Sequence, residues 1–289
     1  MVSLPDWLSF RRLAATATGM AGLLIALGIF TSASGSGLAC AQQWPLCDGG
    51  VLPQTIPSFV EWFHRLWAMI TGFVIFGVGA WAWRAADARA TKLAAVGAAL
   101  LTPLQAVFGA ITVTFNGALP AGYSAPVHAA HFLTGSSIFL GLTYTTLRAY
   151  EGLSTRPLAE RARTALRVAV GGLLVCALLS RALPPLQFGP WVQAVFYLAA
   201  LGTLGALVAA VRWLGRLGRG RLRAAAALAA VAHGAAMVLG RDLLYYNTVV
   251  RSANLIAVLA AVALAVGTAW SLETESGRDP GRSRAPTDD

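Results

Sequence analysis

The sequence predicts an all-α integral membrane protein of eight transmembrane helices, arranged as two related four-helix bundles. Hydrophobic residues make up 57% of the chain and charged residues 12%, whereas a soluble domain carries about 25% charged residues. Several apolar runs approach or exceed the ~20 residues needed to cross a bilayer. The net charge of +10 lies mostly between these runs. That distribution is typical of membrane topology and excludes the concentrated basic surface of a nucleic-acid-binding protein.

The apolar runs place the eight spans in order along the chain. We expect them at about residues 13–33, 61–83, 92–115, 125–148, 163–182, 190–213, 222–240 and 248–271. The first run is longer than the 7–15-residue apolar core of a signal peptide, so we expect an uncleaved span. The polar segment 273–289 contains Pro and Gly, which favours a disordered tail.

Basic residues mark alternate connections and so predict the sidedness of the chain. They precede the first span, lie between spans two and three, four and five, and six and seven, and recur in the tail. The intervening connections contain few basic residues, with no Lys or Arg between Arg12 and Arg65 or between Lys92 and Arg148. By the positive-inside rule, both termini are cytoplasmic and the loop after the first span faces outward.

The two halves of the chain resemble a degenerate tandem repeat. The segment 105–113 in span three is similar to 230–238 in span seven, and 127–131 is similar to 250–254. Both halves begin on the same side, so the repeats are expected to be parallel, each a four-helix bundle. The predicted units are residues 1–150, residues 151–272 and the cytoplasmic tail 273–289.

Two histidines stand at matched depth in the first half. His64 lies about one turn into span two and His131 about two turns into span four. At ~1.5 Å per residue, both lie within roughly 10 Å of the outer surface. Such a pair on different helices of a bundle can ligate a haem from both faces, or both can be hydrogen-bonded core residues. His128, one turn from His131, could substitute as ligand, but it lies nearer the surface.

Charged and thiol side chains surround these histidines. Glu61 shares a helix face with His64; it is either an N-terminal carboxylate favoured by the helix dipole or a catalytic group. Arg65 pairs with a haem propionate or snorkels to the interface. Cys40 and Cys47 lie on the oxidising side, where a disulfide persists as a staple or as a redox pair. Cys176 and His233 lie within later spans and are expected to be core residues.

The segments SGSGLAC, QWPLCDG and EWFHR, then Gln105-Ala with Gly109-Ala, and then Ala-His131-Phe resemble the heme A synthase family, over roughly residues 30–135. In that family, eight spans form two similar halves, and the enzyme oxidises the C8 methyl of heme O to a formyl group, making heme A for cytochrome oxidase. The resemblance implies that His64 and His131 ligate the haem iron in the substrate site. It also implies that Glu61 is the family's important glutamate, and that Cys40 and Cys47 are its outer-loop pair.

The second half departs from the family pattern. The family places two further histidines there, for a b-type cofactor haem thought to pass electrons. Here residues 189–197 contain no histidine, Asn254 stands at the last ligand position, and the equivalent cysteine-bearing loop is missing. Because Phe and Asn cannot replace imidazole as strong iron ligands, we expect the cofactor haem to be absent from this chain.

The resemblance implies a membrane oxidoreductase of the prokaryotic cytoplasmic (inner) membrane, in contact with the lipid bilayer and acting on heme O. Its implied partners are a heme O synthase, an electron donor or a second copy of the chain, and no nucleic acid. One alternative is a non-enzymatic haem-binding paralogue acting in oxidase assembly. A quinone-linked thiol oxidase would need a second redox pair, and Cys176 stands alone. A solute transporter is disfavoured because no span is clearly broken at mid-membrane by Gly or Pro.

Overall fold

The computed structural model describes residues 9–114, 125–182, 186–241 and 243–277, except residues 42, 44, 45 and 244. Within these ranges the chain folds into eight α-helices and two short 3₁₀ turns, with no strands. The helices are α1 (Phe10–Ala33), α2 (Ile56–Ala85), α3 (Arg89–Thr114), α4 (Ala125–Tyr150), α5 (Leu158–Leu179), α6 (Pro190–Arg216), α7 (Gly220–Leu239) and α8 (Thr248–Gly277). The 3₁₀ turns are η1 (Ser36–Leu38) and η2 (Glu151–Leu153).

Each span expected from the sequence corresponds to one helix. Seven of the eight helices are long and apolar enough to cross a membrane by length and composition. The other is α4, whose 26 residues include Ser, Thr and both His128 and His131. Several boundaries differ from expectation by three to six residues, including the start of α5 at Leu158, five residues earlier than expected. Helix α2 starts at Ile56, where Thr55 accepts the N–H of Ser58, and α8 continues to Gly277. Residues 273–277 of the expected tail are therefore helical, and residues 278–289 lie outside the described residues.

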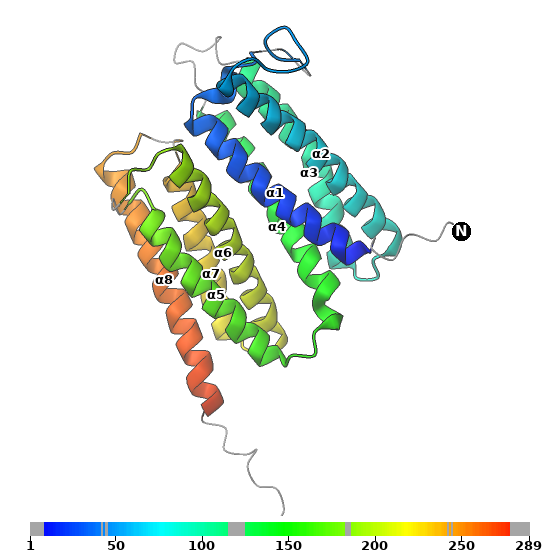
Figure 1. Cartoon of the computed structure of the whole chain (residues 1–289). Coiled ribbons are helices and arrows are strands. Elements are labelled where there is room, and N and C mark those ends of the chain that lie inside the picture. The colour runs from blue at the N-terminus through cyan, green and yellow to red at the C-terminus, as the bar shows by residue number, and fades with distance from the viewer. Residues whose placement is uncertain are drawn as a thin grey trace, which may run out of the picture.

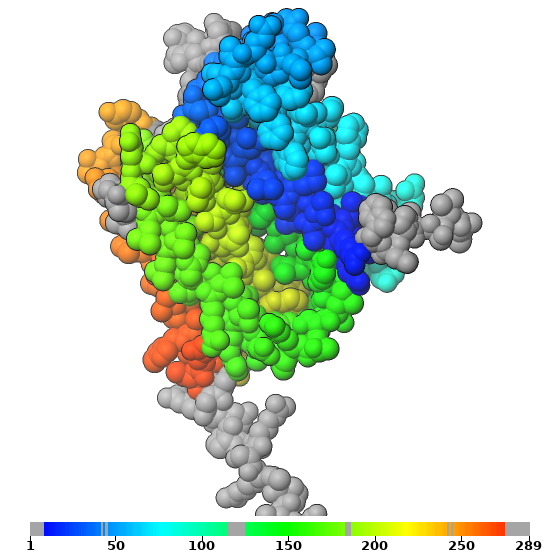
Figure 2. All heavy atoms as spheres, in the orientation of Figure 1, coloured from blue at the N-terminus to red at the C-terminus, as the bar shows by residue number. Residues whose placement is uncertain are grey.

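The helices form two bundles of four side by side (Figure 1). In the first bundle, α1 and α3 each pack against both α2 and α4. Helices α2 and α4 therefore stand diagonally across the bundle. In the second bundle, α5 packs on α6 and α8, and α7 packs on the same two helices. The α1–α2 connection projects beyond the helices (Figure 2); we call this the loop end of the molecule.

Small residues bring neighbouring helices close together, as is typical of membrane bundles. A Cβ added at Gly79 of α2 would lie 2.7 Å from Cβ of Ala99 on α3. One added at Gly172 of α5 would lie 2.2 Å from Oγ1 of Thr203 on α6. These glycines set the helix spacing within each bundle.

The two bundles share one core. Helix α6 packs on α1 and α4, and a continuous buried cluster runs from Phe132 and Phe139 of the first bundle to Tyr197 and Leu201 of the second. The ring of Phe132 meets that of Tyr197 at 5.5 Å between centroids. The halves are therefore packed together as one body.

The end opposite the loop end is held by a charged cluster around Glu151. Its carboxylate forms ion pairs with Arg148, Arg212 and Arg216. Burial raises the pKa of Glu151, but hydrogen bonds and charges from these arginines outweigh the burial, so that its pKa lies below the usual value. The cluster ties the α4–α5 connection to α6, and so links the two bundles.

Candidate functional site

The loop between α1 and α2 is closed by a disulfide. Cys40 and Cys47 are bonded to each other, with their Cα atoms 4.8 Å apart, and both side chains are buried. Cys47 also exchanges two backbone hydrogen bonds with Gly50. The turn between them places Asp48 at a φ of 54° and Gly49 at 74°. The pairing expected of these cysteines is confirmed.

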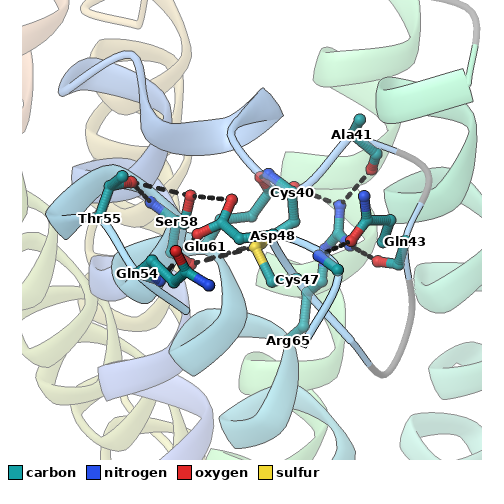
Figure 3. The surroundings of a disulfide bond; sticks show 11 residues. Cys40, Ala41, Gln43, Cys47, Asp48, Gln54, Thr55, Ser58, Glu61 and Arg65 are labelled. Atoms are coloured by element: carbon teal, nitrogen blue, oxygen red, sulfur yellow. Dashed lines mark hydrogen bonds and ion pairs between the residues drawn. A yellow bond between two sulfur atoms is a disulfide. The ribbon is translucent and has the colours of Figure 1, made fainter. Parts of the chain in front are cut away.

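Polar side chains fasten this loop onto the first turn of α2 (Figure 3). Asp48 accepts a hydrogen bond from the Ser58 hydroxyl at 3.0 Å and another from the Gln54 N–H at 2.8 Å. The two cysteine sulfurs lie 3.4 and 3.8 Å from the carbonyl oxygen of Ser58. The disulfide is therefore seated directly on the start of α2.

Glu61 lies beneath the disulfide and is 2% exposed. Its Oε2 accepts the backbone N–H of Cys40 at 2.6 Å, and its Oε1 forms an ion pair with Arg65, one turn further along α2. The carboxylate thus joins the helix to the loop, and it points toward Cys40 in Figure 3. A buried carboxylate held in this way is fixed in position one turn from His64.

Arg65 is engaged by the same loop. Besides Glu61, its guanidinium donates to the carbonyl oxygen of Gln43 at 2.7 Å and to that of Ala41 at 3.1 Å. Arg65, expected at a haem propionate or at the membrane interface, therefore holds the loop against α2. Its Nε–H and one Nη1–H are the donors not used in these contacts.

The two histidines face the interior of the first bundle from diagonal helices. A Cβ added at Gly28 of α1 would lie 2.9 Å from Cε1 of His64, and one added at Gly109 of α3 would lie 3.3 Å from Cε1 of His131. Each imidazole therefore rests on a glycine of a neighbouring helix. The two histidines and the two glycines thus come from all four helices of the first bundle, near its loop end. The sequence predicted the shared depth of the histidines but gave no sign of Gly28.

Each imidazole keeps an unsatisfied nitrogen. Among the described residues, the buried Nδ1 atoms of His64 and His131 have no hydrogen-bond partner, and neither does Oε1 of Gln105. The side-chain nitrogen of Gln105 lies 3.4 Å from Nε2 of His131. His64 and His131 are also near enough to interact electrostatically. Unsatisfied buried polar atoms are rare and call for an explanation.

A haem iron fits this donor set. Neutral imidazole is a normal axial ligand of haem, and ligands on facing helices of a four-helix bundle are a recurring arrangement. In the described part of the chain, no three His, Cys, Asp or Glu side chains come together to hold another metal. Two imidazoles alone would not hold a free metal ion, but His64 and His131 would suffice to hold the iron of a haem, whose porphyrin supplies the other ligands. His128 lies within electrostatic range of His131, one turn closer to the loop end.

In the second bundle, Asn254 stands where the sequence comparison expects the last haem ligand, and its Oδ1 is buried with no hydrogen-bond partner among the described residues. Asn254 is buried and donates to the Tyr246 hydroxyl at 3.1 Å. His233 is buried and lies 3.0 Å from the carbonyl oxygen of Ala200, which confirms the expectation of a core histidine. Cys176 is buried and is not in a disulfide, as expected of a small apolar residue.

Comparison with known proteins gives this chain a family. Residues 11–183, more than half of the chain, match the family COX15-CtaA, described as cytochrome oxidase assembly protein. Heme A synthase of Bacillus licheniformis is 33% identical over 43% of this chain and 40% of its own length. Heme A synthase of Geobacillus kaustophilus is 33% identical over 47% and 43%.

A differently named relative is also similar to this chain. Protoheme IX farnesyltransferase of Haloarcula marismortui is 35% identical over 44% of this chain and 26% of its own length. The matches to all three relatives span less than half of each relative. The family match runs from α1 to the end of α5, and so contains the disulfide loop, Glu61 and both site histidines. The chain therefore belongs to the COX15-CtaA family of cytochrome oxidase assembly proteins.

Proposed function

We propose that this chain is a heme A synthase-like oxidoreductase that converts the C8 methyl of heme O into a formyl group. One observation carries the proposal. His64 and His131 face each other from diagonal helices, and each rests on a glycine and keeps a buried ring nitrogen without a partner. The similarity to proteins named heme A synthase supports heme O as the substrate.

The proposed roles follow the geometry of the loop end. His64 and His131 hold the iron of heme O, with the C8 methyl towards Glu61. Each of two successive oxidations replaces a C–H bond of the methyl carbon by a C–O bond to the oxygen of a water molecule and releases two electrons and two protons. The resulting geminal diol loses water to give the aldehyde. Glu61, fixed by Cys40 and Arg65, accepts the released protons in a site of low dielectric.

We propose that the second bundle holds no b-type haem. Asn254 and Tyr246 are hydrogen-bonded to each other, and Asn is not a strong iron ligand. Electrons from the substrate must then leave through a separate redox partner or through the Cys40–Cys47 pair, whose disulfide accepts two electrons and two protons on reduction. The loop contacts of Glu61 place this pair next to the proposed proton acceptor.

We further propose a multi-pass protein of a bacterial cytoplasmic membrane, with both termini inside and the disulfide loop outside. The charge distribution of the connections supports this orientation. The proposed partners are lipid, an electron donor, a second copy of the chain and the farnesyltransferase that makes heme O. The last is supported by the similar segment in a relative named protoheme IX farnesyltransferase.

Product analysis tests this function directly. The protein is purified from cells that supply heme O, and its haems are extracted and separated by mass. The wild type should yield the formyl product, whereas His64→Ala and His131→Ala should yield none. Bound haem without any formyl product in the wild type would contradict the proposed activity.

The same outcome would support the second candidate function, a non-enzymatic haem-binding protein of oxidase assembly. The observation that favours it is Asn254, a weak iron ligand, buried at the position proposed to lack a haem ligand; without a second haem, the chain would have no haem of its own to carry electrons. Formation of the formyl product by the purified protein, when it is supplied with heme O and an oxidant, would exclude this candidate.

A further inference from the structure

An arginine of the second bundle is buried at the loop end beside the site of the first. Arg241 follows Gly240, the residue that ends α7, and is 7% exposed. Arginine is almost never fully buried unless it is paired, because removing its charge from water costs several kcal/mol. Its position therefore calls for an anionic partner.

The described part of the chain provides no such partner. Nε of Arg241 is buried and has no hydrogen-bond partner. Among the described residues, no carboxylate forms an ion pair with it. The guanidinium lies over the rings of Phe132 and Tyr197, 5.7 Å from each centroid. Such cation–π contacts offset only part of the desolvation of a buried charge.

The position of Arg241 indicates which anion could serve as its partner. Phe132 directly follows His131 on α4, and Arg241 lies within electrostatic range of the His131 imidazole. A guanidinium from the second bundle thus lies at the boundary between the bundles, over the ring of Phe132 and within electrostatic range of His131. Any ligand held on His131 would bring its own substituents close to this charge.

Arg65, which also lies near the histidines, already has hydrogen-bond partners in the protein. It donates to Glu61 and to two loop carbonyl oxygens, whereas the Arg241 guanidinium donates to no carboxylate or carbonyl oxygen among the described residues. A haem carries two propionate carboxylates at one edge, and the planar fork of an arginine matches a carboxylate in a bidentate pair.

We propose that Arg241 binds a propionate carboxylate of the haem held between His64 and His131. The proposal rests on the proposed function for the position of the haem. It gives the second bundle a part in the substrate site although the bundle has no haem ligand of its own. The contact fixes the rotation of the porphyrin about the iron, and therefore which methyl group lies towards Glu61.

Comparison of haem with its dimethyl ester tests the contact without any change to the protein. Titrations of the detergent-solubilised full chain use iron protoporphyrin IX and its dimethyl ester, and binding is followed by visible absorption. Wild-type protein should bind the free acid about tenfold or more tightly than the ester, since a charge-assisted hydrogen bond is lost in the ester. Equal affinities would overturn the proposal.

Variants assign the preference to Arg241. Arg241→Met should lose about tenfold or more in affinity for the free acid and keep its affinity for the ester, and Arg241→Lys should keep part of the preference. The control is Arg251→Met, at an exposed arginine near the start of α8, which should bind as the wild type does. An Arg241→Met protein that keeps the full preference would refute the contact and leave the proposed function intact. A wild type that binds neither compound, or whose binding is unchanged in His64→Ala, would refute the proposed function and this proposal together.

Discussion

At the scale of single residues, each imidazole of the candidate site packs against a glycine of a neighbouring helix, with little room for a side chain there. Gly28→Ala would place a methyl group 2.9 Å from Cε1 of His64, closer than carbon atoms pack, so the ring must move away from the position proposed for iron ligation. We expect haem affinity to fall by about tenfold, measured by titration. Gly19→Ala is the matched control on the same helix, because nothing lies within 4 Å of an added Cβ there. Equal haem affinities in the two variants would contradict the claim that packing of the His64 ring against Gly28 positions it for haem binding.

Substitutions can separate the loop contacts of Glu61 from its proposed role as a proton acceptor. Glu61→Gln should keep bound haem and abolish formation of the formyl product, because the amide cannot accept the protons. Arg65→Met breaks the same ion pair but leaves the carboxylate in place, so it should retain product formation at a reduced rate. Haem content and extracted product measure both effects. If the two variants lose product equally, Glu61 is only an anchor for the loop.

The sequence could predict the chemistry of the site residues but not all of their contacts. The spacing of Glu61 and His64 on one helix face and the pairing of Cys40 with Cys47 were both predictable. The hydrogen bond from Cys40 to Glu61 spans 21 positions and depends on a loop that contains positive-φ residues. The position of Arg241 depends on how two bundles pack, and no local pattern encodes that.

At the scale of elements, glycines on facing helices decide how closely those helices approach. All eight helices were predictable, since the length of each apolar run sets its span. The sequence could not predict which glycine faces which neighbouring helix, because that depends on how each helix is rotated about its axis. Adjacent Gly171 and Gly172 on α5 illustrate this, because only Gly172 faces α6.

Gly172→Ala would place a methyl group 2.2 Å from Oγ1 of Thr203. We expect the free energy of unfolding to fall by about 1–3 kcal/mol, measured in detergent. Gly171→Ala should be neutral or slightly stabilising, because an added Cβ there meets nothing within 4 Å and Ala favours helix. Adding Thr203→Ala to Gly172→Ala should restore part of the loss. Equal effects at the two glycines would contradict the α5–α6 packing.

At the scale of the whole molecule, the two bundles are joined by the shared core and by the Glu151 cluster. The pKa of Glu151 lies below its usual value of 4.5, so its contribution to stability is present above that pH. The contribution is lost as the pH falls through the lowered pKa of the folded state. Glu151→Gln should cost about 2 kcal/mol or more at neutral pH and abolish this part of the acid dependence.

The control for that cluster is Glu160→Gln. Its side chain is 50% exposed, and it pairs with Arg156 at 3.9 Å, so little stability should depend on it. Thermal unfolding between about pH 3 and pH 7 compares the variants across the usual carboxyl range. An acid transition in Glu151→Gln identical to that of the wild type would show that other carboxyl groups control the acid stability.

The central claim is that the first bundle holds one haem on His64 and His131 and that the second bundle holds none. The most direct test is the haem-to-protein ratio of the purified full chain, recorded together with the spectral signature of bis-histidine ligation. The account predicts about one haem per chain with that signature, and its loss in both His64→Ala and His131→Ala. Two haems per chain, or a signature that survives both substitutions, would contradict it.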